Sequence, residues 1–227
     1  MSFENTSNFR EYDRYLELKR SSSLNYKGVD LLKSLSFELL GAMTTGSGLR
    51  FHQYLHFVFL RIDCSKLSEG FESARTVFTT FFKDRHDYSE LVRCIQSSVS
   101  SSVVVGLNPH KISIKVNLET WLKAIRFYLI KNKISGISFR TRLYMVIRTI
   151  YVSNIIDDLD KEFKTKDLKN KNYIPFNSSA GIEATITQYL NSKGVNTFHI
   201  FHGLFGRYKI SIANDVINGE ILTPGSF

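Results

Sequence analysis

The sequence predicts an α/β protein in which a largely helical N-terminal region leads into a strand–helix–strand unit. Apolar residues repeat at helical spacing through the middle of the chain. Nearer the C-terminal end, two short apolar runs of strand-like composition flank one further helix. The 227 residues suffice to bury a sizeable hydrophobic core.

Residues 1–116 are expected to form a mainly helical region with uncertain strands. The apolar residues of Val29–Met43 favour a helix, whereas Phe51–Ile62 fits a buried strand or a buried helix equally well. Ser68–Phe82 is expected to be a helix. Tyr88–Val105 begins with helical composition and ends with the composition of a strand.

Residues 117–171 are expected to form a helical hairpin and a charged connector. The side chain of Asn117 can cap the first helix, whose apolar residues share one face at Leu118, Trp121, Leu122, Ile125 and Leu129. The lysine-rich stretch 161–171 follows a second helix, whose apolar face consists of Leu143, Val146, Ile147 and Ile150.

Residues 172–227 contain the strand–helix–strand unit. Tyr173–Phe176 has the composition of a strand, and a helix follows with its apolar stripe at Ile182, Ile186, Tyr189 and Leu190. Lys193 and Gly194 are typical of a helix C-terminus, and Val195–Phe201 is a second strand. This order predicts two parallel strands joined by a helical crossover.

Polar residues and glycines follow both strands at their carboxyl ends: Asn177, Ser178, Ser179, His202, Gly203 and Gly206. Ligands of a parallel sheet bind outside this edge. The imidazole of His202 is a candidate proton donor or acceptor, the glycines allow backbone N–H groups to approach a ligand, and the helix N-terminus favours an anion. The alternative is that His202 only anchors a loop and that both glycines only turn the chain.

Charge and composition restrict the class of protein. Thirty Lys and Arg against 21 Asp and Glu give a net charge of +9, which points to nucleic acid, an acidic membrane surface or a phosphorylated small molecule as partner. Two cysteines exclude a disulfide scaffold. No apolar run reaches the length of a membrane span, and the first residues lack a signal-peptide core, so we expect a cytoplasmic globular protein.

The sequence predicts no metal site and no resident cofactor. His52 and His56 are spaced for one helix face, but the glutamate of a zinc-protease motif does not lie between them. The acidic residues Asp157, Asp158 and Asp160 stand next to lysines, which is typical of a solvated helix end. The standard dinucleotide and P-loop glycine motifs do not occur.

The ordered set of segments Tyr173–Ala184, Gln188–Phe198 and His202–Gly203 resembles a stretch of bacterial capsule and lipopolysaccharide glycosyltransferases of GT-B type. The resemblance covers residues 118–225 and implies a Rossmann-like βαβ element, half of a GT-B architecture. It implies catalytic roles for His202 and Glu183. It also implies a substrate-binding role for the polar turn and the glycines, at Asn177, Ser178, Ser179, Gly203 and Gly206.

The same resemblance implies partners and a location. The chain corresponds to the acceptor-side half, so its partners would be a glycan or lipid-linked glycan acceptor and the inner face of the inner membrane. The nucleotide-sugar donor would bind a second half, expected after Phe227 or as a separate chain, which makes this chain a truncated piece, a gene remnant or one half of a split enzyme. Nucleic acid is not the expected partner, but a non-catalytic, basic nucleic-acid-binding protein is the alternative.

Overall fold

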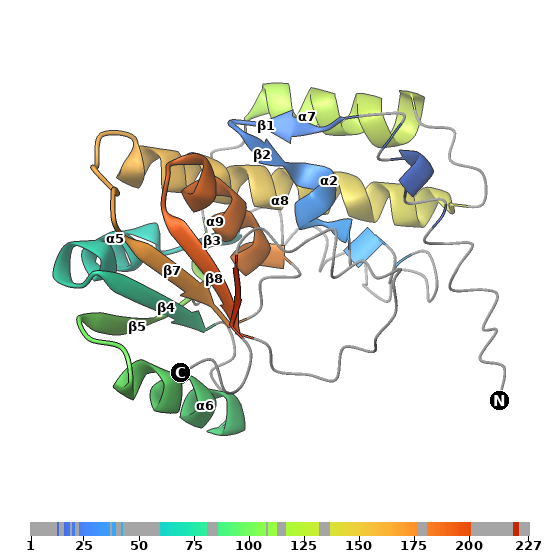
Figure 1. Ribbon diagram of the computed structural model, residues 1–227. Coiled ribbons are helices and arrows are strands. Elements are labelled where there is room, and N and C mark those ends of the chain that lie inside the picture. The colour runs from blue at the N-terminus through green and yellow to red at the C-terminus, as the bar shows by residue number, and fades with distance from the viewer. Residues whose placement is uncertain are drawn as a thin grey trace, which may run out of the picture.

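A computed structural model gives the fold (Figure 1). It describes residues 13, 16–18, 20, 23–36, 38, 39, 42, 60–80, 86–107, 109–112, 117–131, 137–176, 181–200 and 220–222.

Five parallel strands form the central sheet, in the order β5-β4-β7-β8-β9 (Figure 1). They are β4 (Thr76–Thr80), β5 (Ser102–Gly106), β7 (Asn172–Pro175), β8 (Asn196–Ile200) and β9 (Glu220–Leu222). In chain order the arrangement is second, first, third, fourth, fifth, which is a doubly wound order. Its topological switch point lies between β4 and β7. The α/β class and the parallel pairing of the strands on either side of the last helix are confirmed.

Helices cover both faces of this sheet. α6 (His86–Ser97) packs on one face. α5 (Cys64–Ser73), α8 (Phe139–Phe163) and α9 (Gly181–Ser192) pack on the other face, where α8 crosses the molecule as its longest helix (Figure 1).

The alternation of side chains along the strands divides the core in two. Phe78 and Ile174 belong to the cluster under α6, together with Phe176, whereas Val77 and Tyr173 belong to the large cluster that contains α5, α8 and α9. Because successive strand residues point to opposite faces, strands buried on both sides read as continuous apolar runs.

An outer layer covers α8. It consists of α2 (Leu31–Ser34), α7 (Leu118–Ile125) and the π-helical turns η1 (Arg126–Lys131). The side chain of Asn117 accepts hydrogen bonds from the backbone N–H groups of Glu119 and Thr120, which confirms the predicted cap of α7.

Two antiparallel pairs lie outside the main sheet. β1 (Asn25–Tyr26) and β2 (Val29–Asp30) form a hairpin, and β3 (Leu60–Ile62) pairs with β6 (Pro109–Ile112). The hairpin turn places Lys27 at φ 47° and Gly28 at φ 83°, as the tight turns of right-twisted hairpins require.

The predicted helix Ser68–Phe82 is wrong in its second half. α5 ends at Ser73, Ala74 adopts an extended conformation, and β4 begins at Thr76. Four of the five residues of β4 are β-branched, and they pair with β5 and β7. Pairing on both sides overrides the helical pattern that α5 begins.

Close packing of α5 on the sheet depends on Gly70. A Cβ atom at this position would lie 2.9 Å from Cγ2 of Val105 and 3.4 Å from Cγ1 of Val103. We expect Gly70→Ala to lower the free energy of unfolding by about 1–3 kcal/mol, measured by urea denaturation, because the helix has to move off β5. Glu69→Ala, on the exposed side of α5, is the control. A gain in stability, as helix propensity alone would give, would contradict this packing.

Candidate functional site

A buried polar cluster lies at the switch point, where β4 and β7 end. Glu183 stands in the first turn of α9 and is 2% exposed. Its Oε1 accepts a hydrogen bond of 2.7 Å from the hydroxyl of Thr79, near the end of β4. The same oxygen lies 3.2 Å from the backbone nitrogen of Phe176, the residue directly after β7. The N–H of Phe176 also donates to the backbone carbonyl of Thr79. One carboxylate therefore joins the ends of β4 and β7 to the N-terminus of α9.

Tyr173 extends this cluster into the core. Its hydroxyl lies 2.8 Å from Oγ1 of Thr79. Because the Thr79 proton is directed to Glu183, the Tyr173 hydroxyl is the donor to Thr79. Burial raises the pKa of Tyr173 well above its ordinary value, and the negative charge of Glu183 raises it further, against the hydrogen bond with Thr79. Tyr173 therefore keeps its proton and remains a donor.

His199 lies on the same face of the sheet and is 3% exposed. Tyr173 and Thr197 are partners in the β7–β8 register, so His199, two residues further along β8, shares their face nearer the carboxyl edge. Sequence reasoning missed Thr79, Tyr173 and His199. The alternation of side chains along β8 could have placed His199 on the α9 side of the sheet, because its neighbours Phe198 and Ile200 both pack on the α6 side.

A buried ion pair lies next to the same helix N-terminus. Nε and Nη2 of Arg148 donate to the two carboxylate oxygens of Glu38 at 2.5 and 2.7 Å, and Tyr144 donates to Glu38 at 3.3 Å. A Cβ atom at Gly181, where φ is +63°, would lie 3.3 Å from Oε1 of Glu38. Burial acts to lower the pKa of Arg148, but the charge of Glu38 and its hydrogen bonds outweigh burial and raise it.

Of the site residues predicted from the sequence, the structure places Glu183. The others lie outside the described residues: Asn177, Ser178, Ser179, His202, Gly203 and Gly206. Phe176 and Ile200 are the last described residues before these two segments. Since β7 and β8 are parallel neighbours, Phe176 and Ile200 both lie toward the carboxyl edge that carries the buried cluster of Glu183, Thr79 and Tyr173, which we call the Glu183 cluster.

Comparison of this chain with protein-family models, with curated proteins and with solved structures gives no match. The class of protein is defined by the fold and the site alone: it is an α/β protein with a buried polar cluster at the switch point of a parallel sheet. None of the helices in the described part of the chain is long and apolar enough to cross a membrane.

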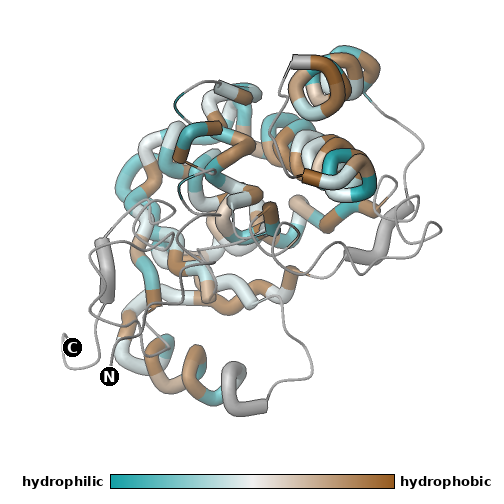
Figure 2. The backbone as a smooth tube through the Cα atoms, turned by 90° about the vertical axis from the view of Figure 1, so that its right-hand side faces the viewer, coloured by the Kyte–Doolittle hydropathy of each residue, from teal (hydrophilic) through white to brown (hydrophobic). Residues whose placement is uncertain are grey.

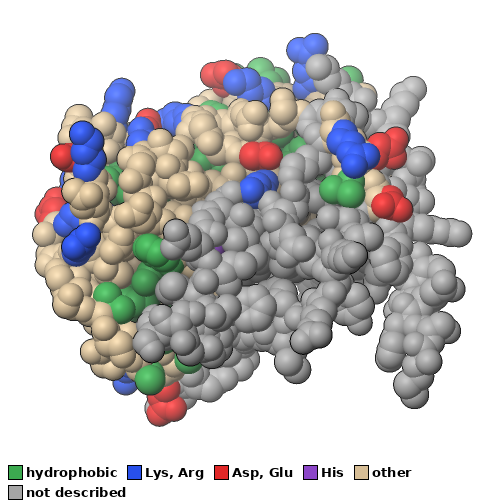
Figure 3. Space-filling model, in the orientation of Figure 1, with side chains coloured by type: hydrophobic (Ala, Val, Ile, Leu, Met, Phe, Trp, Pro, Cys, Tyr) green, Lys and Arg blue, Asp and Glu red, His purple; other side chains and the backbone are tan. Residues whose placement is uncertain are grey.

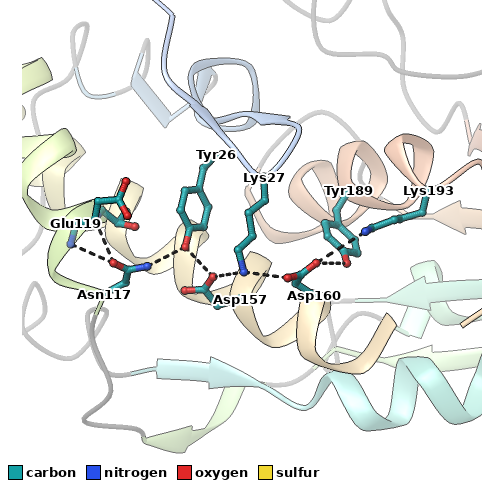
Figure 4. Close-up of polar contacts among 9 residues, drawn as sticks. Tyr26, Lys27, Asn117, Glu119, Asp157, Asp160, Tyr189 and Lys193 are labelled. Carbon is teal, nitrogen blue, oxygen red and sulfur yellow. Dashed lines mark hydrogen bonds and ion pairs between the residues drawn. The ribbon is translucent and has the colours of Figure 1, made fainter. Parts of the chain in front are cut away.

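A second polar network joins elements at the other end of α9 (Figure 4). Nζ of Lys27 lies 2.8 Å from Oδ1 of Asp157 and 3.0 Å from Oδ2 of Asp160, both on α8. Tyr26 donates to Asp157 at 2.7 Å, and Tyr189 of α9 donates to Asp160 at 3.2 Å. These contacts hold the β1–β2 hairpin against α8 and α9, so we assign the acidic residues a structural role.

Replacement of Lys27 by methionine is expected to remove pH-dependent stability. Burial acts to raise the pKa of Asp160, but the hydrogen bond and charge of Lys27 outweigh it and lower that pKa, so this contribution is lost as pH falls through the folded-state value. Burial acts to lower the pKa of Lys27, but Asp157 and Asp160 raise it to about 12. The stability from Lys27 is therefore full below its unfolded-state pKa and is lost as pH rises through about 12.

The measurement is urea denaturation of wild type and Lys27→Met across pH. We expect a difference in unfolding free energy of about 1 kcal/mol at neutral pH that shrinks at both extremes. The exposed Lys66 on α5 supplies the control variant Lys66→Met. A difference that stays constant with pH would show that the ion pairs contribute nothing.

Proposed function

We propose that this chain is the acceptor-side half of a glycosyltransferase of GT-B type that acts in bacterial capsule or lipopolysaccharide synthesis. The observation that carries the proposal is the Glu183 cluster at the switch point between β4 and β7, because doubly wound sheets bind their ligands in the crevice at this point. In this proposal the parallel sheet is the Rossmann-like half of the two-domain architecture.

The proposed reaction needs a base and a site that receives developing negative charge. His202 takes the proton of the acceptor hydroxyl as its oxygen attacks the anomeric carbon of the donor sugar, and the nucleotide leaves with the bonding electron pair. Backbone N–H groups at the N-terminus of α9 and at Gly203 and Gly206 favour the phosphate charge. Asn177, Ser178 and Ser179 supply hydrogen bonds for sugar hydroxyls.

Glu183 acts in this proposal as a positioning residue. Its carboxylate is buried and shared between Thr79 and the backbone N–H of Phe176, so it fixes where the polar segment after β7 begins. A group held in this way sets the geometry of a site without contact with the sugar.

A lipid-linked glycan acceptor would place the enzyme at a membrane. Glycans of this class are assembled on lipid carriers, so the enzyme would work at the inner face of the inner membrane. The donor, a nucleotide sugar, is held mainly by the second half, which is either joined to this chain or supplied by another one.

The test is transfer activity of this chain combined with a donor-binding half. Release of nucleotide from a panel of UDP-, GDP-, CMP- and dTDP-linked sugars is measured with bacterial membranes as the source of acceptor. We expect turnover that needs both halves and that falls about 100-fold or more in His202→Ala, as the loss of a general base predicts. Unchanged turnover in His202→Ala would refute the proposed base. Tight, steeply salt-dependent binding of nucleic acid without turnover would favour the alternative function.

A further inference from the structure

The outer surface of α7 and η1 carries large apolar side chains that point away from the core. The exposed fraction is 71% for Leu118, 59% for Leu122 and 66% for Ile130, and Phe139 at the start of α8 is also 71% exposed. The buried positions of α7 are instead Thr120 and Ala124. Of the apolar face predicted for this helix, Leu118 and Leu122 are exposed, whereas Trp121, Ile125 and Leu129 pack against the core. We call the four exposed side chains Leu118, Leu122, Ile130 and Phe139 the α7 patch.

The patch lies at the periphery of the molecule. Figure 2 shows hydrophobic residues on the outermost helix, which lies beyond α8. Figure 3 shows hydrophobic and basic side chains together along the edge formed by α7. Phe127 and Tyr128 of η1 are buried against the core, so this layer is anchored and its outer face is held in one orientation.

Basic side chains accompany the patch. Lys123, Arg126 and Arg140 are exposed, and each lies within four residues of a patch residue in the sequence. The acidic residue of α7, Glu119, pairs with Lys123 at 2.6 Å. Leu118, Leu122, Arg126 and Ile130 follow one another at a spacing of four residues, so apolar and cationic groups share one stripe.

We propose that the α7 patch binds an anionic lipid surface, with the helix lying in the membrane interface. Apolar side chains flanked by Lys and Arg are the composition of interfacial helices, and each basic residue near an acidic leaflet adds to binding. The net charge of the whole chain, +9, is also positive and so favours an anionic surface. A second copy of the chain is a poorer occupant, because a two-fold interface would bring the basic side chains of both copies together.

The contact would orient the chain on a membrane whether or not it transfers sugar, and it is tested without substrate.

The experiment is sedimentation of the full chain with vesicles. One set contains equimolar phosphatidylglycerol and phosphatidylcholine, and the other contains phosphatidylcholine alone. We expect binding to the anionic vesicles that weakens as salt is raised. Lys123→Gln/Arg126→Gln is expected to weaken this binding about 20-fold. Leu122→Asn/Ile130→Asn is expected to weaken it about tenfold or more, because apolar burial is lost.

The matched control is Leu91→Asn/Arg93→Gln, which changes exposed apolar and basic residues on α6. It should bind as wild type does, and circular dichroism should show all variants folded. Absence of binding to anionic vesicles, or equal loss in the α6 control, would overturn the proposal. Sedimentation velocity without lipid tests the other occupant: self-association that Leu122→Asn/Ile130→Asn abolishes would assign the patch to a second copy and would also overturn it.

Discussion

Replacement of Glu183 by alanine is expected to lower the free energy of unfolding by about 3 kcal/mol or more. The carboxylate is 2% exposed and accepts from the Thr79 hydroxyl. Its removal leaves that hydroxyl and part of the Phe176 N–H interaction unsatisfied in the core. The Thr79 hydroxyl, which accepts from Tyr173, also loses the acceptor that fixes its orientation. Charge-assisted hydrogen bonds at a helix N-terminus are the stronger kind, which makes this loss large.

Urea denaturation of a small set of variants separates the contributions. Thr79→Ser keeps the hydroxyl and should cost far less than Thr79→Val, which removes it. Glu183→Gln keeps an acceptor oxygen and should fall between wild type and Glu183→Ala. If Glu183→Ala lost less than about 1 kcal/mol, the carboxylate would not join the strand ends as described.

The substitution Glu38→Ala is expected to cost about 3–5 kcal/mol, because it leaves the guanidinium of Arg148 buried without its counter-charge. The exposed fraction of the Arg148 side chain is 10% and that of Glu38 is 16%, so water replaces little of the lost interaction. Stacking of Arg148 on the ring of Tyr151, with 4.9 Å to the centroid, remains but does not neutralise the charge.

Substitution of both partners tests this reasoning. Glu38→Leu/Arg148→Met should recover most of the stability lost in Glu38→Ala, because no uncompensated charge is left. The free energies come from urea denaturation under identical conditions. A double variant as unstable as the single one would show that packing or the Tyr144 hydrogen bond, and not the buried charge, governs the effect.

Local patterns account for the elements that the sequence predicts well. Asn117 caps α7 as expected, and α9 ends at Ser192 before Gly194, which has φ 82°. The backbone N–H of Val195 returns to the carbonyl of Leu190, which is the hydrogen bonding of a glycine-terminated helix. The helix cap and the glycine-terminated helix end each depend on a few adjacent residues, so both can be predicted from the sequence without knowledge of the fold.

Long-range pairing accounts for what the sequence did not predict. β4 is an interior strand paired with β5 on one side and β7 on the other, but the helix predicted from the sequence extended from α5 into its β-branched residues. Thr79 and Glu183 are 104 residues apart, so their hydrogen bond has no local signature. The exposure of Leu118 and Leu122 was equally hidden, because periodicity shows that a helix has an apolar face and not what covers it.

We propose above all that the carboxyl edge at the switch point is a ligand site. The most direct test is amide chemical-shift mapping of the chain during titration with oligosaccharides prepared from bacterial capsule and lipopolysaccharide. We expect saturable shifts at Thr79, Phe176 and the first turn of α9, and weaker binding in a folded Glu183→Gln variant. Shifts confined to other elements, or no shift at any concentration, would contradict the assignment of this edge as the acceptor site.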